Sequence, residues 1–356
     1  MLAYPALANA RAQVGADNLY FVVFAENRFI VDLLEIVPPD NVIAIRTGNP
    51  VQTFVETLRA VRRMRRVDIE ATIDCEFFAR SSAILSYLSG ARTRVGFHAY
   101  FGEASYRGDL MTHRLSFNPF LHASQIFHLL VEAIGCPPER LPACDVESPN
   151  ELVLPQITPA EQDQAAVEGL LRDSLGGVTV PPLVLLNANC GDLLPLRRWA
   201  PERYVELARR LLDRYPELAI VFTGAPDEAV EAAALVDEIA SDRCVSLAGR
   251  TSLPQLFALY SLAELMVTND SGPGHYSTVT SIDVISLFGP ETPAVFGPRT
   301  PRSHVLWSGI ACSPCVNAFN DRQSACTDNV CMAKISVEEV FELACRVYEA
   351  RIRATE

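Results

Sequence analysis

Residues 267–276, VTNDSGPGHY, bring a run of apolar residues to an abrupt end. The pattern predicts a strand (residues 264–268, ELMVT) that ends at Asn269 and Asp270, followed at once by a helix beginning at Ser271 and Gly272. The first N–H groups of a helix have no partner within the helix, and the positive end of the helix dipole points the same way. Such a turn is a candidate site for an anion such as phosphate.

The other residues of this turn are small or polar, as an anion site requires. Gly272 and Gly274 carry no side chain that would keep a phosphate away. Asp270 or Ser271 is expected to cap the helix, and His275 lies one turn in, on the face expected to meet the ligand. The simpler interpretation, a capped turn with a histidine in the core, fits this segment equally well when it is taken alone.

A second strand end in the same half of the chain carries cationic side chains. Residues 182–187 (PLVLLN) predict a strand, and residues 188–204 (ANCGDLLPLRRWAPERY) lead through a glycine loop into a helix. The planar guanidinium of Arg197 or Arg198 is suited to phosphate oxygens, so one of them is a candidate for the opposite side of the same anion. A solvated arginine pair is the alternative. Two such strand ends in one domain favour the ligand interpretation.

Apolar runs alternate with helical patterns throughout the chain, which is typical of βαβ units and parallel sheets. The length of 356 residues suits two domains. We predict a first domain at residues 1–147, a linker at 148–159, which contains three prolines, and a second domain at 160–335. A capping box, Ser336 with Glu339, predicts the start of a final helix within 336–356. The expected ligand position is a central cleft at the carboxyl ends of strands.

Composition narrows the class of partner. The chain is 49% apolar and 21% charged, with a net charge of −13. No apolar run approaches the length of a membrane span, and no signal peptide is recognised, so a cytoplasmic protein is expected. The acidic balance argues against sequence-independent nucleic-acid binding, which depends on basic residues. Small molecules or local sites are the expected partners.

Five segments in order, LLNANCGDLLPLRRWAPERY, VFTGAPDE, LAGRTSL, VTNDSGPGHYSTV and LFGPETP, resemble glycosyltransferase family 9, the ADP-heptose:lipopolysaccharide heptosyltransferases and their relatives. The resemblance covers nearly all of residues 182–340 and extends more weakly over the first half. It implies an α/β fold of GT-B architecture, in which two Rossmann-like parallel-sheet domains face a central cleft. The second domain is then expected to hold the nucleotide sugar.

The resemblance also implies roles for individual donor-binding residues. Asp270, Ser271, Gly272 and His275 match the family's D-[ST]-G-x-x-H motif at the sugar and diphosphate. The remaining matches are Arg197, where the family usually has a lysine near the phosphates, Glu228, matching the acid at the ribose hydroxyls, and Thr251, on the loop behind the adenine.

The implied activity is an inverting, metal-independent transfer of a sugar from a nucleoside diphosphate to a cell-surface glycan or lipopolysaccharide-type acceptor. Heptose and ADP are favoured as the sugar and the nucleotide, and no cofactor is required for catalysis. Fixed amides at Ser271 and Gly272, with Arg197, would stabilise the leaving diphosphate. The alternative, from another class, is a non-catalytic nucleotide-sugar-binding or assembly protein that has lost its base.

The catalytic base is unassigned. Residues 1–11 (MLAYPALANAR) match the family segment that follows the first strand and its Gly-Asp loop, whose aspartate is the usual base. We therefore expect an N-terminally incomplete first domain with an unpaired sheet edge. Either the sequence as given starts after the first strand, or this family member has lost the catalytic base. A substitute base is possible among three residues, although no sequence motif spacing supports any of them: Glu103, Asp109 and His122.

Two further patterns have open interpretations. Arg59, Arg62, Arg63 and Arg66 share one helical face, which is either a solvated surface or a contact to anionic lipid at the inner membrane. A second pattern has zinc-ligand spacing, with reduced or disulfide-linked thiols as the alternative to a structural zinc site. It consists of Cys312, Cys315, Cys326 and Cys331.

Overall fold

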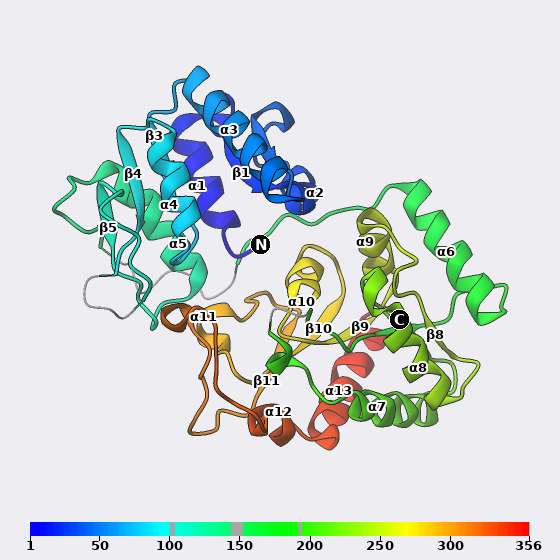
Figure 1. Cartoon of the computed structure of the whole chain (residues 1–356). Coiled ribbons are helices and arrows are strands. Elements are labelled where there is room, and N and C mark those ends of the chain that lie inside the picture. Colours follow the sequence, from blue (N-terminus) through cyan, green and yellow to red (C-terminus); the bar gives the residue numbers. More distant parts are fainter. Residues whose placement is uncertain (100–103, 144–151, 192–193, 356) are drawn as a thin grey trace. The chain divides into compact units, whose positions relative to one another are not determined.

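The computed structural model describes residues 1–99, 104–143, 152–191 and 194–355. It contains two compact units, which are described separately (Figure 1). The N-terminal unit comprises Leu2–Val153 and Asn317–Gln323; the C-terminal unit comprises Leu154–Val316, Ser324–Glu356 and Met1. The division after Val153 falls inside the segment predicted as a linker, of which 148–151 lie outside the described residues.

The C-terminal unit is built on a six-stranded sheet in the order β11-β10-β9-β6-β7-β8, and every recorded pairing within it is parallel. The chain starts at β6, builds outward through β7 and β8, and then returns to the other side of β6 to add β9, β10 and β11. The direction of winding therefore reverses between β6 and β9, which is where such sheets bind ligands. The strands are β6 Leu183–Asn187, β7 Ala219–Phe222, β8 Cys244–Ser246, β9 Leu265–Asn269, β10 Asp283–Phe288 and β11 Ser303–Trp307.

Helices lie against this sheet (Figure 1). Every residue of β6, β7 and β9 is buried, which explains why these strands are continuous apolar runs in the sequence. Val184 and Leu186, which are alternate residues of β6, share a core with apolar side chains of three helices, α7, α8 and α13. The helices are α6 Glu161–Leu175, α7 Pro201–Arg214, α8 Ala229–Ile239, α9 Leu253–Leu262, α10 Gly272–Tyr276, α11 Pro293–Phe296, α12 Val330–Lys334 and α13 Val337–Thr355.

The predicted start of the last helix is confirmed. The Ser336 hydroxyl accepts a hydrogen bond from the Glu339 N–H at 3.2 Å, and the Glu339 carboxylate accepts from the Ser336 N–H at 2.9 Å. A second box of this kind starts α9: the Ser252 hydroxyl accepts from the Gln255 N–H, and the Gln255 side chain accepts from the Ser252 N–H. These contacts satisfy helix N–H groups that have no partner in the helix.

The N-terminal unit contains two separate parallel sheets, β1-β2 and β3-β4-β5. Its strands are β1 Phe21–Phe24, β2 Val42–Ile45, β3 Ala71–Ile73, β4 Thr93–Phe97 and β5 His113–Leu115. Its helices are α1 Tyr4–Val14, α2 Arg28–Leu33, α3 Pro50–Arg66, α4 Arg80–Leu88 and α5 Ala123–Glu132.

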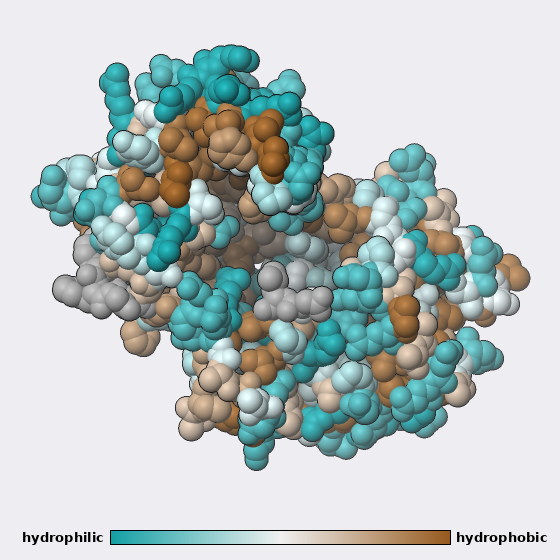
Figure 2. Space-filling model, viewed as in Figure 1, coloured by the Kyte–Doolittle hydropathy of each residue, from teal (hydrophilic) through white to brown (hydrophobic). Residues whose placement is uncertain are grey.

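In the described part of the chain, β1 pairs only with β2, and β3 pairs only with β4. No residue of β1 or β3 is fully buried, whereas β6, β7 and β9 of the other unit are buried throughout. Figure 2 shows apolar side chains at the surface over the segments that are blue to cyan in Figure 1.

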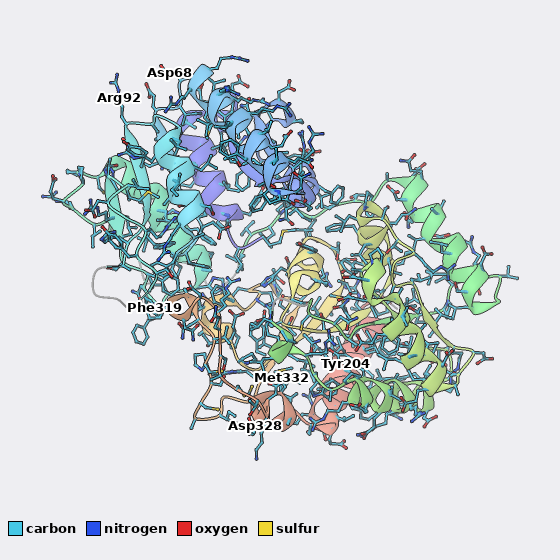
Figure 3. All side chains as sticks on the ribbon, in the orientation of Figure 1. Asp68, Arg92, Tyr204, Phe319, Asp328 and Met332 are labelled. Atoms are coloured by element: carbon cyan, nitrogen blue, oxygen red, sulfur yellow. The ribbon has the colours of Figure 1, made fainter. Side chains whose placement is uncertain are left out.

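The segment Asn317–Gln323 packs in the N-terminal unit, although it lies within residues 160–335, which were predicted as the second domain. The Phe319 ring, labelled in Figure 3, lies 6.1 Å from the ring of Phe78 and 5.3 Å from that of Phe117. The Asp321 carboxylate accepts a hydrogen bond from the Ser105 hydroxyl at 2.9 Å. Aromatic contacts of this kind stabilise the position of the segment by more than the burial of apolar area alone.

Among the residues that the structure describes, no helix is both long enough and apolar enough to cross a bilayer.

Candidate functional site

A pocket of about 420 Å³ lies at the carboxyl ends of β6, β7 and β9 in the C-terminal unit. Four stretches contribute lining residues: Asn187–Gly191 after β6, Thr223–Glu228 after β7, Thr251–Leu256 at the start of α9, and Ser271–Tyr276 after β9. This position, next to the reversal between β6 and β9, is where an α/β sheet of this order is expected to bind a ligand.

Asn269, the last residue of β9, joins two of these loops. Its side chain is fully buried, and its Oδ1 accepts from the Trp199 backbone N–H at 2.9 Å and the Tyr204 hydroxyl at 3.2 Å. Its Nδ2 donates to the carbonyls of Ala188 at 3.0 Å and Asn189 at 3.2 Å. The side chain therefore holds the loop after β6 against the end of β9.

A second buried amide connects three strands beneath the pocket. Asn187 Nδ2 donates to the Thr223 carbonyl at 3.1 Å, and its Oδ1 accepts from the Thr268 hydroxyl at 3.4 Å. The Thr268 hydroxyl also lies 3.2 Å from the Ser271 hydroxyl. Because these polar groups satisfy one another, the floor of the pocket has a fixed arrangement.

The turn after β9 differs from its prediction in two respects. No side chain caps α10, so the expected cap by Asp270 or Ser271 is wrong: Ser271 is extended (φ −154°, ψ 171°), and its hydroxyl lies beside Thr268 instead. A Cβ on Gly274 would lie 3.2 Å from Ser286 Oγ and from Thr268 Cγ2, so this glycine allows close packing of α10 on the sheet. Gly272, in contrast, lines the pocket.

The structure brings four of the seven predicted donor-binding residues into the pocket wall: Glu228, Thr251, Ser271 and Gly272. The other three do not line the pocket as it stands. Arg197 and His275 are half-buried, and Asp270 is buried.

Glu228 is held in place by the backbone. Its Oε2 accepts a hydrogen bond from the Ala225 N–H at 2.7 Å. A Cβ on Gly224 would lie 2.9 Å from that same oxygen and 3.3 Å from Ala248 Cβ, so a side chain here would displace the carboxylate from this position. The carboxylate is thereby fixed at the pocket wall.

Arg197 lies between two buried carboxylates. Its Nη1 is 3.7 Å from Asp270 Oδ2 and 3.7 Å from Glu291 Oε2, and its side chain is 18% exposed. Glu291 was not singled out in the sequence, although it lies in LFGPETP, one of the five segments that carry the resemblance. Its position just after β10 was the signal that could have found it, because it places Glu291 at the same sheet edge.

The rest of the pocket wall is mainly apolar or aromatic, from Pro226, Leu253, Leu256, Tyr260 and Tyr276. Burial raises the pKa of the Tyr260 and Tyr276 hydroxyls, so both stay neutral at physiological pH. The wall offers an apolar surface beside the polar strand ends, an arrangement that suits a ligand with a planar ring and charged groups.

Cys190, on the loop after β6, is a further lining residue. Burial raises the pKa of its thiol, and the nearby Arg197 and Arg198 oppose that shift in part. The thiol is therefore protonated and unreactive at neutral pH.

The four cysteines with zinc-ligand spacing are free thiols. Cys312 is exposed and Cys331 is buried, and burial raises the pKa of the Cys331 thiol, with further contributions from the other three. No three or more His, Cys, Asp or Glu side chains in the described ranges are grouped so that they could hold a metal ion.

The substitute bases in the N-terminal unit have structural contacts. His122 is buried and caps α5, where its Nδ1 accepts from the Ser124 N–H at 3.4 Å. Asp109 forms an ion pair with Arg114 at 3.2 Å. Glu103 lies outside the described residues.

Comparison with known proteins now identifies the family. The family model described as glycosyltransferase family 9 (heptosyltransferase) matches residues 57–325. The chain belongs to glycosyltransferase family 9. Among family members, it is 31% identical over 114 residues to lipopolysaccharide heptosyltransferase 2 of Escherichia coli (strain K12), and this alignment covers 32% of each protein.

A longer alignment, with lipopolysaccharide heptosyltransferase 2 of Salmonella typhimurium (strain LT2), is 30% identical over 160 residues and covers 44% of each chain. These alignments thus span 32% and 44% of the length of these two curated relatives. The structure of E. coli ADP-heptose lipopolysaccharide heptosyltransferase II matches with a TM-score of 0.69 at 17% identity, covering 98% of this chain and 95% of that one. The predicted fold class, α/β with the parallel sheets of GT-B architecture, is confirmed.

Proposed function

We propose that this family 9 protein transfers a sugar, with heptose favoured, from a nucleoside diphosphate, with ADP favoured, to a cell-surface glycan or lipopolysaccharide-type acceptor. The observation that carries the proposal is the pocket at the β6 and β9 strand ends, whose wall includes Glu228, Thr251, Ser271 and Gly272. The proposal is supported by the curated relatives, which are heptosyltransferases, and by one solved neighbour, the E. coli heptosyltransferase WaaC with ADP (TM-score 0.60, 17% identity, 97% and 95% coverage).

In this proposal each wall of the pocket takes one part of the donor. The Glu228 carboxylate accepts hydrogen bonds from the ribose hydroxyls, since its Oε2 already holds a backbone N–H and fixes its orientation. Thr251 and Leu256 border the base. The backbone N–H groups at Ser271 and Gly272 face the diphosphate, because the start of a helix has N–H groups without helical partners.

The proposed chemistry is a single displacement that inverts the anomeric centre. Breaking the bond between the sugar and the diphosphate places negative charge on the leaving oxygen, and fixed N–H donors stabilise that charge without a divalent ion. Arg197 is the proposed cation. To reach a phosphate, its guanidinium must move from its position between Asp270 and Glu291, whose carboxylates now balance its charge.

Nucleotide binding tests the donor pocket. Thermal unfolding is measured with ADP, UDP, GDP and buffer alone; ligand at about 100 times its dissociation constant adds about 2.7 kcal/mol to the free energy of unfolding. We expect stabilisation by ADP that is lost in Glu228→Gln and kept in Asp227→Asn, an exposed neighbour that does not line the pocket. Equal loss in both variants, or no shift with any nucleotide, contradicts the proposed pocket.

Product analysis tests the reaction. Transfer of heptose from ADP-heptose to a lipopolysaccharide-core acceptor is expected to continue in EDTA and to invert the anomeric configuration. Gly272→Ala is a suitable probe, because the atoms nearest to its new methyl belong to Tyr276 and lie at 3.4 Å, an ordinary contact, yet the methyl lies in the pocket wall. We expect Gly272→Ala to bind ADP more weakly with unchanged stability. A retained configuration, or loss of activity in EDTA that Mg²⁺ restores, refutes the mechanism.

The unassigned base favours one alternative, a nucleotide-sugar-binding or assembly protein without catalysis. The observation behind it is that His122 and Asp109 are occupied by a helix cap and an ion pair. The two functions differ in outcome: both give the ADP shift, and only the enzyme forms product.

We also propose a peripheral contact with the inner membrane through the arginines of α3. Arg59, Arg62, Arg63 and Arg66 are all exposed; Arg59 pairs with Glu56 at 2.5 Å, and Arg63 donates to the Asp40 carbonyl. The charge of Arg62 and Arg66 is thus the more available to anionic lipid. In flotation with anionic vesicles, Arg62→Gln/Arg66→Gln should bind less than the parent; equal flotation makes this a solvated face.

A structural zinc ion is the last component of the proposal. The support is the spacing of the four cysteines, and zinc binding would have to bring together thiols that are not grouped as metal ligands in the described residues. Elemental analysis of reduced protein loaded with zinc is expected to find one equivalent that Cys312→Ser removes. An equal zinc content in Cys312→Ser refutes the site.

A further inference from the structure

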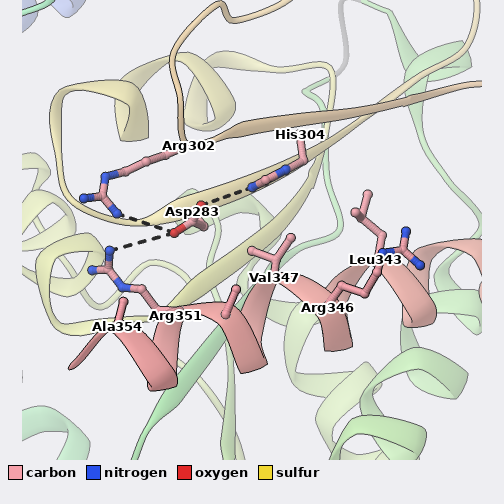
Figure 4. Close-up of a pocket in the computed structure, with 9 residues that line it drawn as sticks. Asp283, Arg302, His304, Leu343, Arg346, Val347, Arg351 and Ala354 are labelled. Carbon is pink, nitrogen blue, oxygen red and sulfur yellow. Dashed lines mark hydrogen bonds and ion pairs between the residues drawn. The ribbon is translucent and has the colours of Figure 1, made fainter. Parts of the chain in front are cut away.

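Two pockets in the C-terminal unit differ in how their buried polar groups are satisfied. One, of about 710 Å³, lies between α13 and the starts of β10 and β11 (Figure 4). The Asp283 carboxylate there lies 3.1 Å from His304 and 3.6 Å from Arg302, and Arg351 lies 3.8 Å away. In the described part of the chain, no residue lining this pocket has a buried side-chain polar atom without a hydrogen-bond partner. Its buried polar groups are therefore satisfied by the protein itself.

The donor pocket, at the carboxyl ends of β6, β7 and β9, has two such atoms. They are the Tyr260 hydroxyl and Asn189 Oδ1, on residues that are 0% and 3% exposed, and neither has a hydrogen-bond partner among the described residues. Asn187 and Asn269, beneath the same pocket, hold hydrogen bonds to neighbouring strands and loops. Because buried polar groups in proteins almost always have a partner, two exceptions in one pocket wall indicate groups that a ligand completes.

Tyr260 is the clearer of the two, because a second tyrosine of this unit shows what a satisfied hydroxyl looks like. Tyr204 is equally buried, and its hydroxyl donates to Asn269 Oδ1 at 3.2 Å. The Tyr260 ring packs against the Phe257 ring, with the ring centres 6.1 Å apart. Burial raises the pKa of the Tyr260 hydroxyl, so the hydroxyl keeps its proton. Tyr260 thus contributes an O–H donor for which the described residues offer no acceptor.

Tyr260 belongs to the part of the wall where the base is expected. It follows Leu256 by four residues on α9, so the two side chains share one helix face, and both line the pocket. Thr251 and Leu253, at the entry to the same helix, line it as well. Tyr276 is close enough to add to the raised pKa of Tyr260. Apolar and aromatic surroundings of this kind suit a planar base.

We propose that Tyr260 determines the specificity of the donor pocket for the nucleobase, by donating a hydrogen bond from its hydroxyl to a ring nitrogen of adenine. The inference rests on the proposed function, in which ADP carries the sugar. The ring nitrogens of adenine are hydrogen-bond acceptors, so one of them satisfies the buried O–H. A base that presents a C–H at this place leaves the hydroxyl unpaired in the complex and binds more weakly.

Titration calorimetry of the full chain with ADP, 1-deaza-ADP, 3-deaza-ADP and 7-deaza-ADP tests the hydrogen bond. Each analogue replaces one ring nitrogen by C–H and keeps the shape of the base. We expect one analogue to bind the parent about two- to tenfold more weakly than ADP, the effect of one lost hydrogen bond. Tyr260→Phe should bind ADP more weakly by a similar factor and should no longer distinguish ADP from that analogue.

Thermal unfolding without ligand separates a binding role from a structural one. Tyr260→Phe removes a hydroxyl that has no partner in the described protein, so its Tm should be unchanged or higher. A lower Tm makes the hydroxyl a structural group and overturns the proposal. Tyr348→Phe is the matched control for ADP binding, because Tyr348 is a buried tyrosine of the same unit that does not line the pocket. It should bind ADP as the parent does.

Three binding results also overturn the proposal. They are equal ADP affinity in Tyr260→Phe and the parent, equal affinity of the parent for ADP and all three analogues, and a loss in Tyr260→Phe that no analogue reproduces. The last places the partner of the hydroxyl on the ribose or the diphosphate. If the parent binds no ADP, the proposed function fails together with this inference, whereas ADP binding that is equal in the parent and in Tyr260→Phe removes the inference alone.

Discussion

Asn269→Ala is expected to destabilise the C-terminal unit strongly. The substitution removes all four hydrogen bonds of a fully buried side chain. Two donors, the Trp199 N–H and the Tyr204 hydroxyl, lose their acceptor, and the carbonyls of Ala188 and Asn189 lose a donor. A buried polar group left without a partner costs about 1–3 kcal/mol, so the two donors alone predict a loss of about 2–6 kcal/mol.

The effect is measured by urea unfolding followed by tryptophan fluorescence. Both tryptophans, Trp199 and Trp307, belong to the C-terminal unit, so the signal reports that unit. For a unit of this size the predicted loss corresponds to a fall of roughly 4–24 °C in Tm, at about 2–4 °C per kcal/mol.

Asp242→Ala is the control, because Asp242 is exposed in the same unit. It should change the free energy of unfolding by less than about 0.5 kcal/mol. If Asn269→Ala lowers that free energy by less than about 1 kcal/mol, the buried amide does not hold the two loops together.

Three further changes have defined outcomes. Ser252→Ala removes the cap of α9 and should cost about 1 kcal/mol in urea unfolding, whereas an unchanged midpoint would show that the Gln255 contact suffices. Gly274→Val places methyl groups against neighbours that a Cβ alone already meets at 3.2 Å, so we expect a loss of about 1–3 kcal/mol in the same assay; a stable variant would contradict the close packing of α10. Burial raises the pKa of Cys244 to about 12, so this thiol stays protonated at mildly alkaline pH and should be alkylated only after unfolding, while the exposed Cys312 reacts in the folded chain. Peptide mapping by mass spectrometry checks this order, and equal labelling rates would contradict it.

The strands that the sequence predicts best are those that both faces of the sheet bury. β6, β7, β9 and β10 are apolar runs bounded by polar or glycine residues, and β6 and β9 lie within one residue of their predicted ends, 182–187 and 264–268. β5 and β8 have three residues each, too few to form a pattern. β11, with the sequence SHVLW, is only half-buried and has no continuous apolar run.

The candidate site could be predicted where its residues directly follow a predicted strand. Ser271 and Gly272 follow β9 directly, and Glu228 follows β7, so parallel pairing brings them to one edge. The position of Arg197 between Asp270 and Glu291 was not predictable in the same way. Which carboxylates meet a given guanidinium depends on the packing of three loops far apart in the sequence, and no periodicity records it.

The packing of Asn317–Gln323 in the N-terminal unit has a consequence for evolution by recombination. The chain passes between the units near Val153, returns near Asn317 and leaves again near Gln323, so a single crossover in the gene cannot exchange one whole unit. A hybrid joined after Val153 would combine Phe78 and Phe117 from one parent with Phe319 from the other. The N-terminal and C-terminal units of two homologues can therefore be exchanged without mixing these aromatic residues only if this short segment is inherited with the N-terminal unit.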